Sequence, residues 1–174
     1  KTFCYIDYNK KQENKNREEK LYLNSQLGNA NLDLKRLYVL TGTTTASASE
    51  AVINCLIPYI GRNNITIIGE KTVGKRVGSN VFGSKEKYGW LLHPIVLRIY
   101  NAERKADYAN GFMPDIEVKE LKVGNKLYPF GDTNELLLKE AISCIIGLQE
   151  LKSKTLNIVD EEELLAKPVF STTR

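Results

Sequence analysis

The most restrictive feature of the sequence is a helical pattern that lies between two short, apolar strand patterns. Residues 36–42 (RLYVLTG) and 65–70 (ITIIGE) are apolar and bounded by glycine or turn residues, as buried strands are. Between them, residues 47–61 (SASEAVINCLIPYIG) repeat apolar side chains at helical spacing, and Pro58 is expected to end or kink the helix. Strands that alternate with helices favour an α/β layered domain.

Three further stretches carry strand patterns. Residues 2–8 (TFCYIDY) are rich in β-branched and aromatic residues, and residues 21–24 (LYLN) are the expected returning strand. Residues 88–101 (YGWLLHPIVLRIYN) predict one long strand, or a strand pair interrupted at Pro94, because proline cannot donate to a sheet ladder. These patterns add strands on both sides of the core region.

A second helix and two polar segments complete the pattern. Residues 131–152 repeat apolar positions densely, and Asp132 or Thr133 is the expected N-cap of this helix. Residues 9–20 are almost wholly polar and predict a mobile loop or the tip of a hairpin. Residues 153–174 form a polar tail that is expected to pack weakly.

Composition excludes several classes of protein. The 174 residues carry 25 Lys and Arg against 21 Asp and Glu, a net charge of +4 with no long basic run, so nothing indicates nucleic-acid binding. The three cysteines, Cys4, Cys55 and Cys144, have no metal-binding or disulfide spacing. No apolar run approaches the ~20 residues of a membrane span. The chain begins with a strand pattern rather than with Met, which suggests a piece of a longer precursor.

The segment between the first core strand and the helix has the chemistry of a nucleophile site. Ser47 follows a run of small residues (TGTTTASASE) and stands where the helix begins. The unpaired N–H groups and the positive dipole end of a helix stabilise a developing oxyanion there. However, Ser47 and Glu50 also form an S-x-x-E capping box, which needs no function.

A lysine in the next loop can complete such a site. From Ser47 the helix runs away for about 20 Å, and the strand at 65–70 returns by about the same length. The loop that contains Lys75 therefore comes back level with Ser47. Enclosure there favours a neutral amine that can take a serine proton, whereas the alternative is a solvated lysine in a turn. His93 is the only histidine, and we expect it to be packed or hydrogen-bonded structurally rather than part of a Ser-His-Asp triad.

At these residues the sequence resembles the tail-specific, or C-terminal processing, serine peptidases. YVLTGTTTASASEAV is similar to the segment of that family that joins a strand to the nucleophile helix, and IIGEKTVGKRVG is similar to its GE-x-T-x-GK loop. NGFMPDIEV resembles the family's G-x-x-PD segment, with Gly111, Pro114 and Asp115 in place. The three motifs occur in the family's order. The resemblance is clear over residues 36–118 and looser over 1–35 and 119–150.

The resemblance implies roles for individual residues. Ser47 matches the nucleophile, Lys75 the general base and Glu50 a supporting glutamate. The backbone N–H of Ser47 or Ala48 would contribute to the oxyanion hole. Ser79 stands where the family commonly has a glutamine that orients the lysine, and a hydrogen bond from Ser79 could replace it.

The resemblance also implies a fold and a setting. The fold would be the β/β/α spiral of the Clp and crotonase type, incomplete, with residues 1–152 as the C-terminal part of the catalytic domain. The upstream oxyanion segment and the PDZ domain of the family would be absent from this chain. Polypeptides would be the substrates, near their C-terminal tails, with no cofactor or metal. The location would be the bacterial periplasm or cell envelope. Whether the chain forms a homo-oligomer is left open.

Two other functions stay open at this stage. One is a non-catalytic relative that only binds peptides, or an inactive fragment. The other is a phosphate-binding module through Gly69–Lys75, which has G-x-x-x-x-G-K spacing after a strand. In that module Ser or Thr should follow the lysine, but this chain has Arg76.

Overall fold

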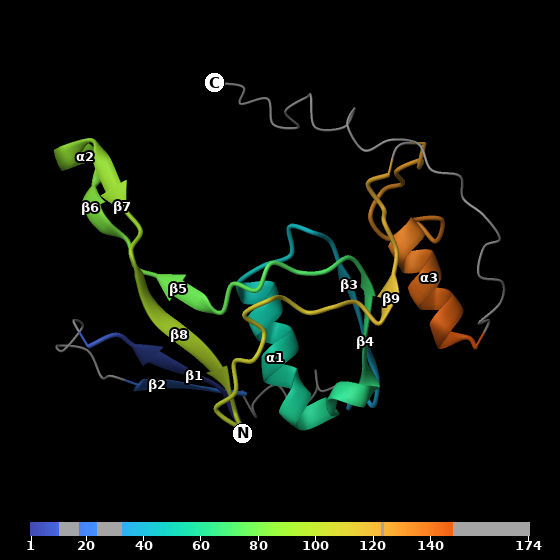
Figure 1. Cartoon of the computed structure of the whole chain (residues 1–174), viewed down its shortest axis with the longest axis horizontal. Helices are drawn as coiled ribbons and strands as arrows, with labels where there is room; N and C mark the ends of the chain where they lie inside the picture. The colour runs from blue at the N-terminus through green and yellow to red at the C-terminus, as the bar shows by residue number, and fades with distance from the viewer. Residues whose placement is uncertain (11–17, 24–32, 123, 148–174) are drawn as a thin grey trace.

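The structure is a computed structural model that describes residues 1–10, 18–23, 33–122 and 124–147 of the chain. The described residues form a mixed α/β arrangement of parallel and antiparallel sheets (Figure 1). The strands are β1 (Thr2–Tyr8), β2 (Glu18–Tyr22), β3 (Leu37–Thr41), β4 (Ile65–Gly69), β5 (Val77–Ser79), β6 (Phe82–Ser84), β7 (Trp90–Leu92), β8 (Ile95–Asn101) and β9 (Ile116–Glu117). The helices are α1 (Ala48–Ile60), α2 (Lys85–Tyr88) and α3 (Leu136–Ile145), and a 3-10 turn, η2, covers Arg62–Asn64.

A parallel sheet of strand order β3-β4-β9 positions the segments of interest. Because side chains alternate along a strand, β4 places Ile65 and Ile67 on one face and Ile68 on the other. Ile65 and Ile67 pack with Ile53 of α1, whereas Ile68 packs with Leu137 of α3. The two helices therefore cover opposite faces of this sheet, as Figure 1 shows. Each fully buried isoleucine contributes about 1.5–3 kcal/mol.

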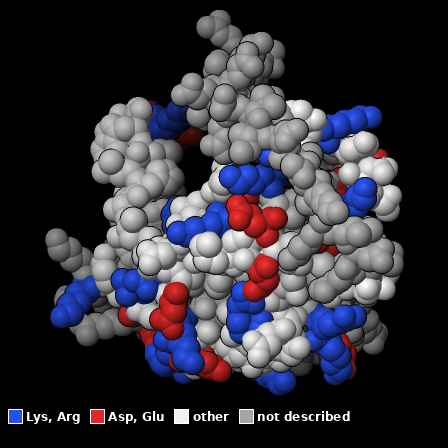
Figure 2. Space-filling model, turned by 45° about the vertical axis from the view of Figure 1, so that its right-hand side comes forward, with Lys and Arg blue, Asp and Glu red and all other residues white. Residues whose placement is uncertain are grey.

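A second sheet, of order β2-β1-β8-β5, is antiparallel. It pairs Cys4 with Asn101 and Tyr8 with Leu97 along β1 and β8. The hairpin of β6 and β7, with α2 between them, forms an arm that extends away from α1 and α3 (Figure 1). Figure 2 shows Lys and Arg side chains interspersed with Asp and Glu on one face of the molecule.

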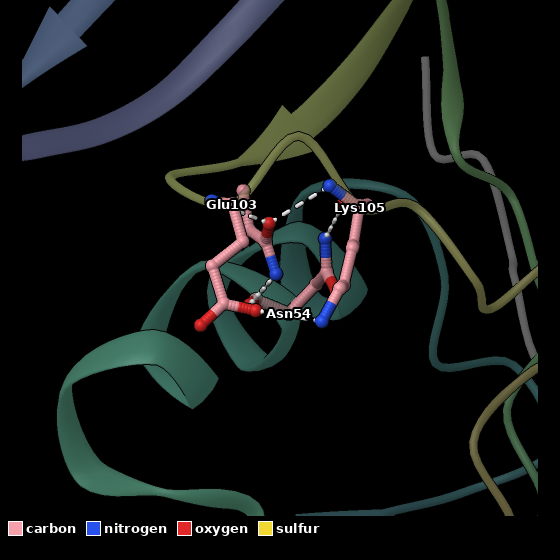
Figure 3. Close-up of polar contacts among 4 residues, drawn as sticks. Asn54, Glu103 and Lys105 are labelled. Atoms are coloured by element: carbon pink, nitrogen blue, oxygen red, sulfur yellow. Dashed lines mark hydrogen bonds and ion pairs between the residues drawn. The ribbon is translucent and has the colours of Figure 1, made fainter.

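A buried polar cluster ties α1 to the end of β8. Pro58 has no N–H, so the Asn54 carbonyl lacks its normal helical donor. The side-chain amide of Asn101 donates to that carbonyl instead, at 3.3 Å. Asn54 in turn donates to the Lys105 carbonyl at 2.8 Å, and Figure 3 shows Asn54 beside Glu103 and Lys105. The helix continues to Ile60, so the proline near its end is accommodated by a side chain from the other sheet.

Most predicted elements are confirmed, but several boundaries are wrong, and among them the second helix, predicted over residues 131–152, ends at Ile145. The strand pair interrupted at Pro94 is present as β7 and β8. However, β2 begins at Glu18, inside the segment predicted to be a loop, because it pairs with β1 in register. Residues 11–17 of that loop and the tail 153–174 lie outside the described residues.

The cap of the second helix also differs from the prediction. The N-cap of α3 is Glu135, not Asp132 or Thr133. The Asp132 side chain accepts from the Asn134 N–H at 2.8 Å, and its carbonyl accepts from the Glu135 N–H at 2.9 Å. Asp132 therefore begins a turn that ends at Glu135, directly before the first residue of the helix. Within the described part of the chain, no helix has the length and apolarity that crossing a membrane requires.

Candidate active site

Ser47 stands at the N-cap of α1 in a rare backbone conformation. Its φ of 57° and ψ of −112° lie where non-glycine residues are uncommon. Such a conformation costs of order 1–3 kcal/mol and persists only where its surroundings hold it. Here the Ser47 N–H donates to Glu50 Oε2 at 2.9 Å, which is one half of a capping box. The N–H of Ala48, at the exposed start of the helix, has no acceptor among the described residues.

Glu50 is the centre of the hydrogen bonding that surrounds Ser47. Its side chain is completely buried, and each carboxylate oxygen accepts two hydrogen bonds. Oε2 accepts from Ser47 N–H and from Lys75 N–H, at 2.9 and 2.8 Å. Oε1 accepts from the Thr72 hydroxyl at 2.5 Å and from the Gly74 N–H at 2.6 Å. A buried charge without a cation is tolerated only with such complete hydrogen bonding.

The shared oxygen brings Ser47 and Lys75 together. Their amide nitrogens lie within about 6 Å of each other, because both are bonded to Glu50 Oε2. The return of the Lys75 loop to the level of Ser47, predicted from helix and strand lengths, is therefore confirmed for the backbone. The side chains are less constrained: Ser47 is half-buried and Lys75 is exposed. In the described part of the chain no hydrogen bond joins the Ser47 hydroxyl to the Lys75 ammonium.

Two glycines allow the Lys75 loop to contact the segment around residue 111. Gly74 has φ +93°, and a Cβ there would lie 2.3 Å from the Ala109 carbonyl oxygen. Gly111 has φ +76°, and its Cβ would lie 1.9 Å from the Thr72 carbonyl oxygen. Only glycine fits at these two contacts. The Thr72 N–H donates to the Phe112 carbonyl at 3.1 Å, and the Phe112 N–H donates to the Thr72 hydroxyl at 2.7 Å.

Thr72 and Phe112 are the functional candidates that sequence reasoning missed. The GE-x-T-x-GK pattern includes the position of Thr72, but nothing in the pattern shows that its hydroxyl reaches a glutamate on another element. The Phe112 contribution is a backbone group, which no side-chain motif can reveal.

Several other predicted residues lie outside this cluster. Ser79 is exposed on β5, opposite Ile95, and no hydrogen bond joins it to Lys75 among the described residues. His93 is exposed between β7 and β8, so of the two expected settings, packed or hydrogen-bonded, the packed one is wrong.

Asp115 of the G-x-x-PD segment has a structural position. Its carboxylate pairs with Arg62 at 2.9 Å and accepts from the Ile67 N–H at 2.8 Å. Partial burial raises the pKa of Asp115, but the hydrogen bonds from Arg62 and Ile67 outweigh it, and the net pKa is lowered. This residue ties η2 to Ile67 in the middle of β4.

Cys4 and Cys55 are buried and unpaired, and Cys144 is half-buried. Burial raises the pKa of the Cys55 thiol to about 12, so it is protonated at neutral pH. A buried protonated thiol is a poor nucleophile. The described residues contain no group of three or more side chains suited to hold a metal ion.

A cavity of about 400 Å³ lies beyond the carboxyl ends of β3 and β4. It is lined by the start of the loop that leads to Ser47 and by Glu70, the start of the loop that leads to Lys75. Glu120 and Glu135 line it as well, with apolar neighbours and no Lys or Arg. Burial, and then the charge of Glu135, raise the pKa of Glu120. The cavity therefore does not suit an anion.

Comparison with known proteins identifies relatives of this arrangement. Residues 3–118 match Peptidase family S41. A crystal structure of a candidate S41 protease from Bacteroides fragilis is similar with a TM-score of 0.72 and 35% identity, over 86% of this chain. The chain spans 38% of the length of that protein. No curated protein matches the chain significantly.

Two further solved structures are more distant. A lipoprotein from Streptococcus agalactiae matches 85% of this chain and 45% of its own, with a TM-score of 0.51 and 15% identity, which shows likeness of fold alone. A photosystem II D1 C-terminal processing protease is 27% identical over 48% of this chain and 20% of its own, with a TM-score of 0.36.

Proposed function

The chain belongs to peptidase family S41, the C-terminal processing proteases, and from this we propose that it is part of a serine endopeptidase in which Ser47 is the nucleophile and Lys75 the general base. The observation that carries the proposal is the shared bond of the Ser47 and Lys75 backbones to one oxygen of Glu50. Two segments that are 28 residues apart are thereby held as one unit. This holds the backbones of the proposed nucleophile and base close together, and the reaction then requires their side chains to come within hydrogen-bond reach.

The proposed reaction is peptide-bond hydrolysis in two steps. The neutral Lys75 amine takes the proton of the Ser47 hydroxyl as its oxygen attacks the substrate carbonyl. The tetrahedral oxyanion receives a hydrogen bond from the Ala48 N–H, at the positive end of α1. The Lys75 ammonium then protonates the leaving amine, and an acyl-enzyme remains on Ser47. Water, deprotonated by Lys75, hydrolyses that ester and restores the serine.

Further parts of the proposal concern the complete protein. We place residues 1–152 in the C-terminal part of a catalytic domain of the β/β/α spiral type. A second oxyanion donor and the cover over the exposed Lys75 side chain would come from other parts of that domain. Ser79 would orient Lys75 only after a side-chain rearrangement. Unfolded or tail-exposed polypeptides would be the substrates, in the periplasm or cell envelope.

A non-catalytic peptide-binding relative is the main alternative, and a phosphate site is disfavoured. The N–H groups of Gly74 and Lys75, which would bind a phosphate, already donate to the Glu50 carboxylate. A strand, β5, follows the loop where a phosphate-binding module needs a helix. Packing explains why residue 69 is glycine without any phosphate, since a Cβ there would lie 1.9 Å from the Thr41 carbonyl oxygen.

Labelling with a fluorophosphonate, in which the oxygen of an activated serine attacks phosphorus and displaces fluoride, tests the proposal on the complete polypeptide that contains these residues. We expect labelling and cleavage of an unfolded protein to fall by about 1,000-fold or more in Ser47→Ala and Lys75→Ala. Ser49→Ala is the matched control, because Ser49 is exposed two residues further along and should leave both rates unchanged. Equal cleavage by wild type and Ser47→Ala would reject the mechanism in favour of the non-catalytic alternative.

A further inference from the structure

We propose that Thr72 is a positioning residue for the Ser47–Lys75 pair and acts on it through the Glu50 carboxylate. The inference rests on the proposed function for its catalytic consequence, but its structural part can be measured separately. Thr72 precedes Lys75 by three residues and does not itself reach the reacting atoms. Its side chain is 3% exposed and lies between two segments that approach from different elements.

The Thr72 hydroxyl takes part in two hydrogen bonds, as the donor in one and as the acceptor in the other. It donates to Glu50 Oε1 at 2.5 Å and accepts from the Phe112 N–H at 2.7 Å. A hydroxyl can donate and accept at the same time. Valine has nearly the same shape as threonine but can do neither. Its introduction would remove the acceptor of the half-buried Phe112 N–H and one of the two donors at Oε1.

The bond at Oε1 matters because of what is bonded to the other oxygen. Ser47 and Lys75 both donate their backbone N–H to Oε2. The two oxygens belong to one rigid, planar group, so donors that fix Oε1 also fix the place of Oε2. The Thr72 hydroxyl therefore determines where the backbones of Ser47 and Lys75 meet, although it contacts neither.

The other side of Thr72 anchors this cluster to the rest of the fold. Its backbone N–H donates to the Phe112 carbonyl at 3.1 Å, while its hydroxyl accepts from the Phe112 N–H. Both polar groups of Phe112 are thus used by one residue. The β-branched side chain of threonine also has restricted χ1 rotamers, which keeps the hydroxyl aimed at Glu50. Serine preserves the chemistry but not this restriction.

Thr41 offers a matched control within the same region. It is also buried, at 2% exposure, and its hydroxyl donates to the Glu70 carbonyl at 2.8 Å, at the start of the loop that carries Thr72. Thr41→Val and Thr72→Val therefore each delete a buried hydroxyl that stabilises the same loop. Only the Thr72 hydroxyl contacts Glu50. A purely structural role for Thr72 predicts similar behaviour of the two variants.

The kinetic test uses the complete polypeptide, with fluorophosphonate labelling of Ser47 and peptide cleavage measured well below the melting temperature of each variant. In Thr72→Val we expect the labelling rate and kcat to fall about 10- to 100-fold, with KM changed by less than about threefold, because the nucleophile and base are misplaced. Thr72→Ser should retain both rates within about threefold, as should Thr41→Val. Equal rates in wild type and Thr72→Val, or equal losses in the two valine variants, would overturn the inference.

Amide hydrogen exchange supplies a readout that needs no activity. Thr72→Val should speed the exchange of the Gly74 and Lys75 amides about tenfold or more relative to Thr41→Val, because their acceptor is no longer fixed. Unchanged exchange at those amides would overturn the positioning role whatever the kinetics show. If wild type is folded and protected there but is not labelled by the fluorophosphonate and does not cleave peptides, the proposed catalytic function fails, and the structural role of Thr72 is still decided by exchange.

Discussion

Two carboxylates hold the segments around β4, one beyond its carboxyl end and one between its middle residue and the turn at its amino end, and they do so in different ways. Glu50 is completely buried and is bonded by four donors, none of them a cationic side chain. Asp115 is 39% exposed and pairs with the Arg62 guanidinium, with one additional bond from the Ile67 N–H. The first gathers the loops that follow β3 and β4, whereas the second ties the turn before β4 to the strand.

The difference indicates which end of the sheet carries chemistry. In α/β sheets, ligands bind beyond the carboxyl ends of parallel strands. Glu50 lies at that end, and its donors include the backbones of the proposed nucleophile and base. Asp115 links the middle of β4 to Arg62 in the turn before the strand, and such an exposed ion pair contributes modestly to stability. Residues 108–115 run from the first carboxylate to the second, so a change at one end can be compared with a change at the other.

Replacing Glu50 should give the largest effect. In Glu50→Gln, an amide NH2 takes the place of an oxygen that now accepts two hydrogen bonds, so it opposes donors instead of accepting from them. We expect the free energy of unfolding to fall by about 3 kcal/mol, since buried donors lose their acceptor. Chemical denaturation with urea measures this value, and fluorophosphonate labelling of Ser47 should be lost in the variant while it is still folded.

The result also tests the contrast itself. If Glu50→Gln lowers the free energy of unfolding no more than Asp115→Asn does, the four hydrogen bonds of Glu50 do not stabilise the fold more than the ion pair of Asp115. If Ser47 is still labelled in a folded Glu50→Gln protein, the Glu50 carboxylate is not required for the reactivity of Ser47.

Replacing Asp115 should have a smaller effect that depends on pH. Asp115→Asn removes the Arg62 ion pair, and the exposure of both partners limits the loss to about 1 kcal/mol at neutral pH. Because the pKa of Asp115 in the folded protein lies below the ordinary value of 3.8, its contribution is present above that pH and is lost as the pH falls through the folded pKa. Urea denaturation of both proteins over this acidic range should show their stabilities converging.

Ser47 labelling is the discriminating measurement for this variant. We expect it to be unchanged in Asp115→Asn, since no bond of Asp115 reaches the Glu50 cluster. A loss of labelling comparable to that of Glu50→Gln would show that the two ends act as one unit through residues 108–115.

The sequence predicts the core elements well because their signals are local. Glycine-bounded apolar runs and the helical spacing between them correctly locate β3, α1 and β4. The predicted cap of the second helix fails because Asp132 competes for a turn before the helix, and sequence cannot decide between two adjacent turns. The start of β2 is missed because its residues are polar and are ordered by pairing with β1.

In the site, too, contacts between residues close in sequence are predictable, whereas contacts between distant segments are not. The S-x-x-E pattern indicates that Glu50 reaches back to Ser47, and the structure contains that bond. The three other donors to Glu50 come from residues 72–75, and no local pattern connects them to the helix. The catalytic roles of Ser47 and Lys75 stay predictions, since the structure fixes their backbones rather than their chemistry.

The smallest effect is expected at Tyr108, where residues 108–115 begin. Its hydroxyl is buried and has no hydrogen-bond partner among the described residues, in contrast to the fully bonded Glu50 nearby. Burial raises the pKa of Tyr108 to about 12, so the group is a neutral phenol. Tyr108→Phe removes an unpaired polar atom and keeps the ring stacked on Phe112, with centroids 5.2 Å apart.

We therefore expect Tyr108→Phe to leave the free energy of unfolding unchanged or to raise it by up to about 1 kcal/mol, as measured by urea denaturation. Tyr108→Leu is the control, because it loses the stacking as well and should lower stability by about 1 kcal/mol or more. A loss above about 1 kcal/mol in Tyr108→Phe would mean that the hydroxyl has a partner outside the described residues. In that case hydrogen bonding, and not only ring packing, would anchor the segment that joins the two carboxylates.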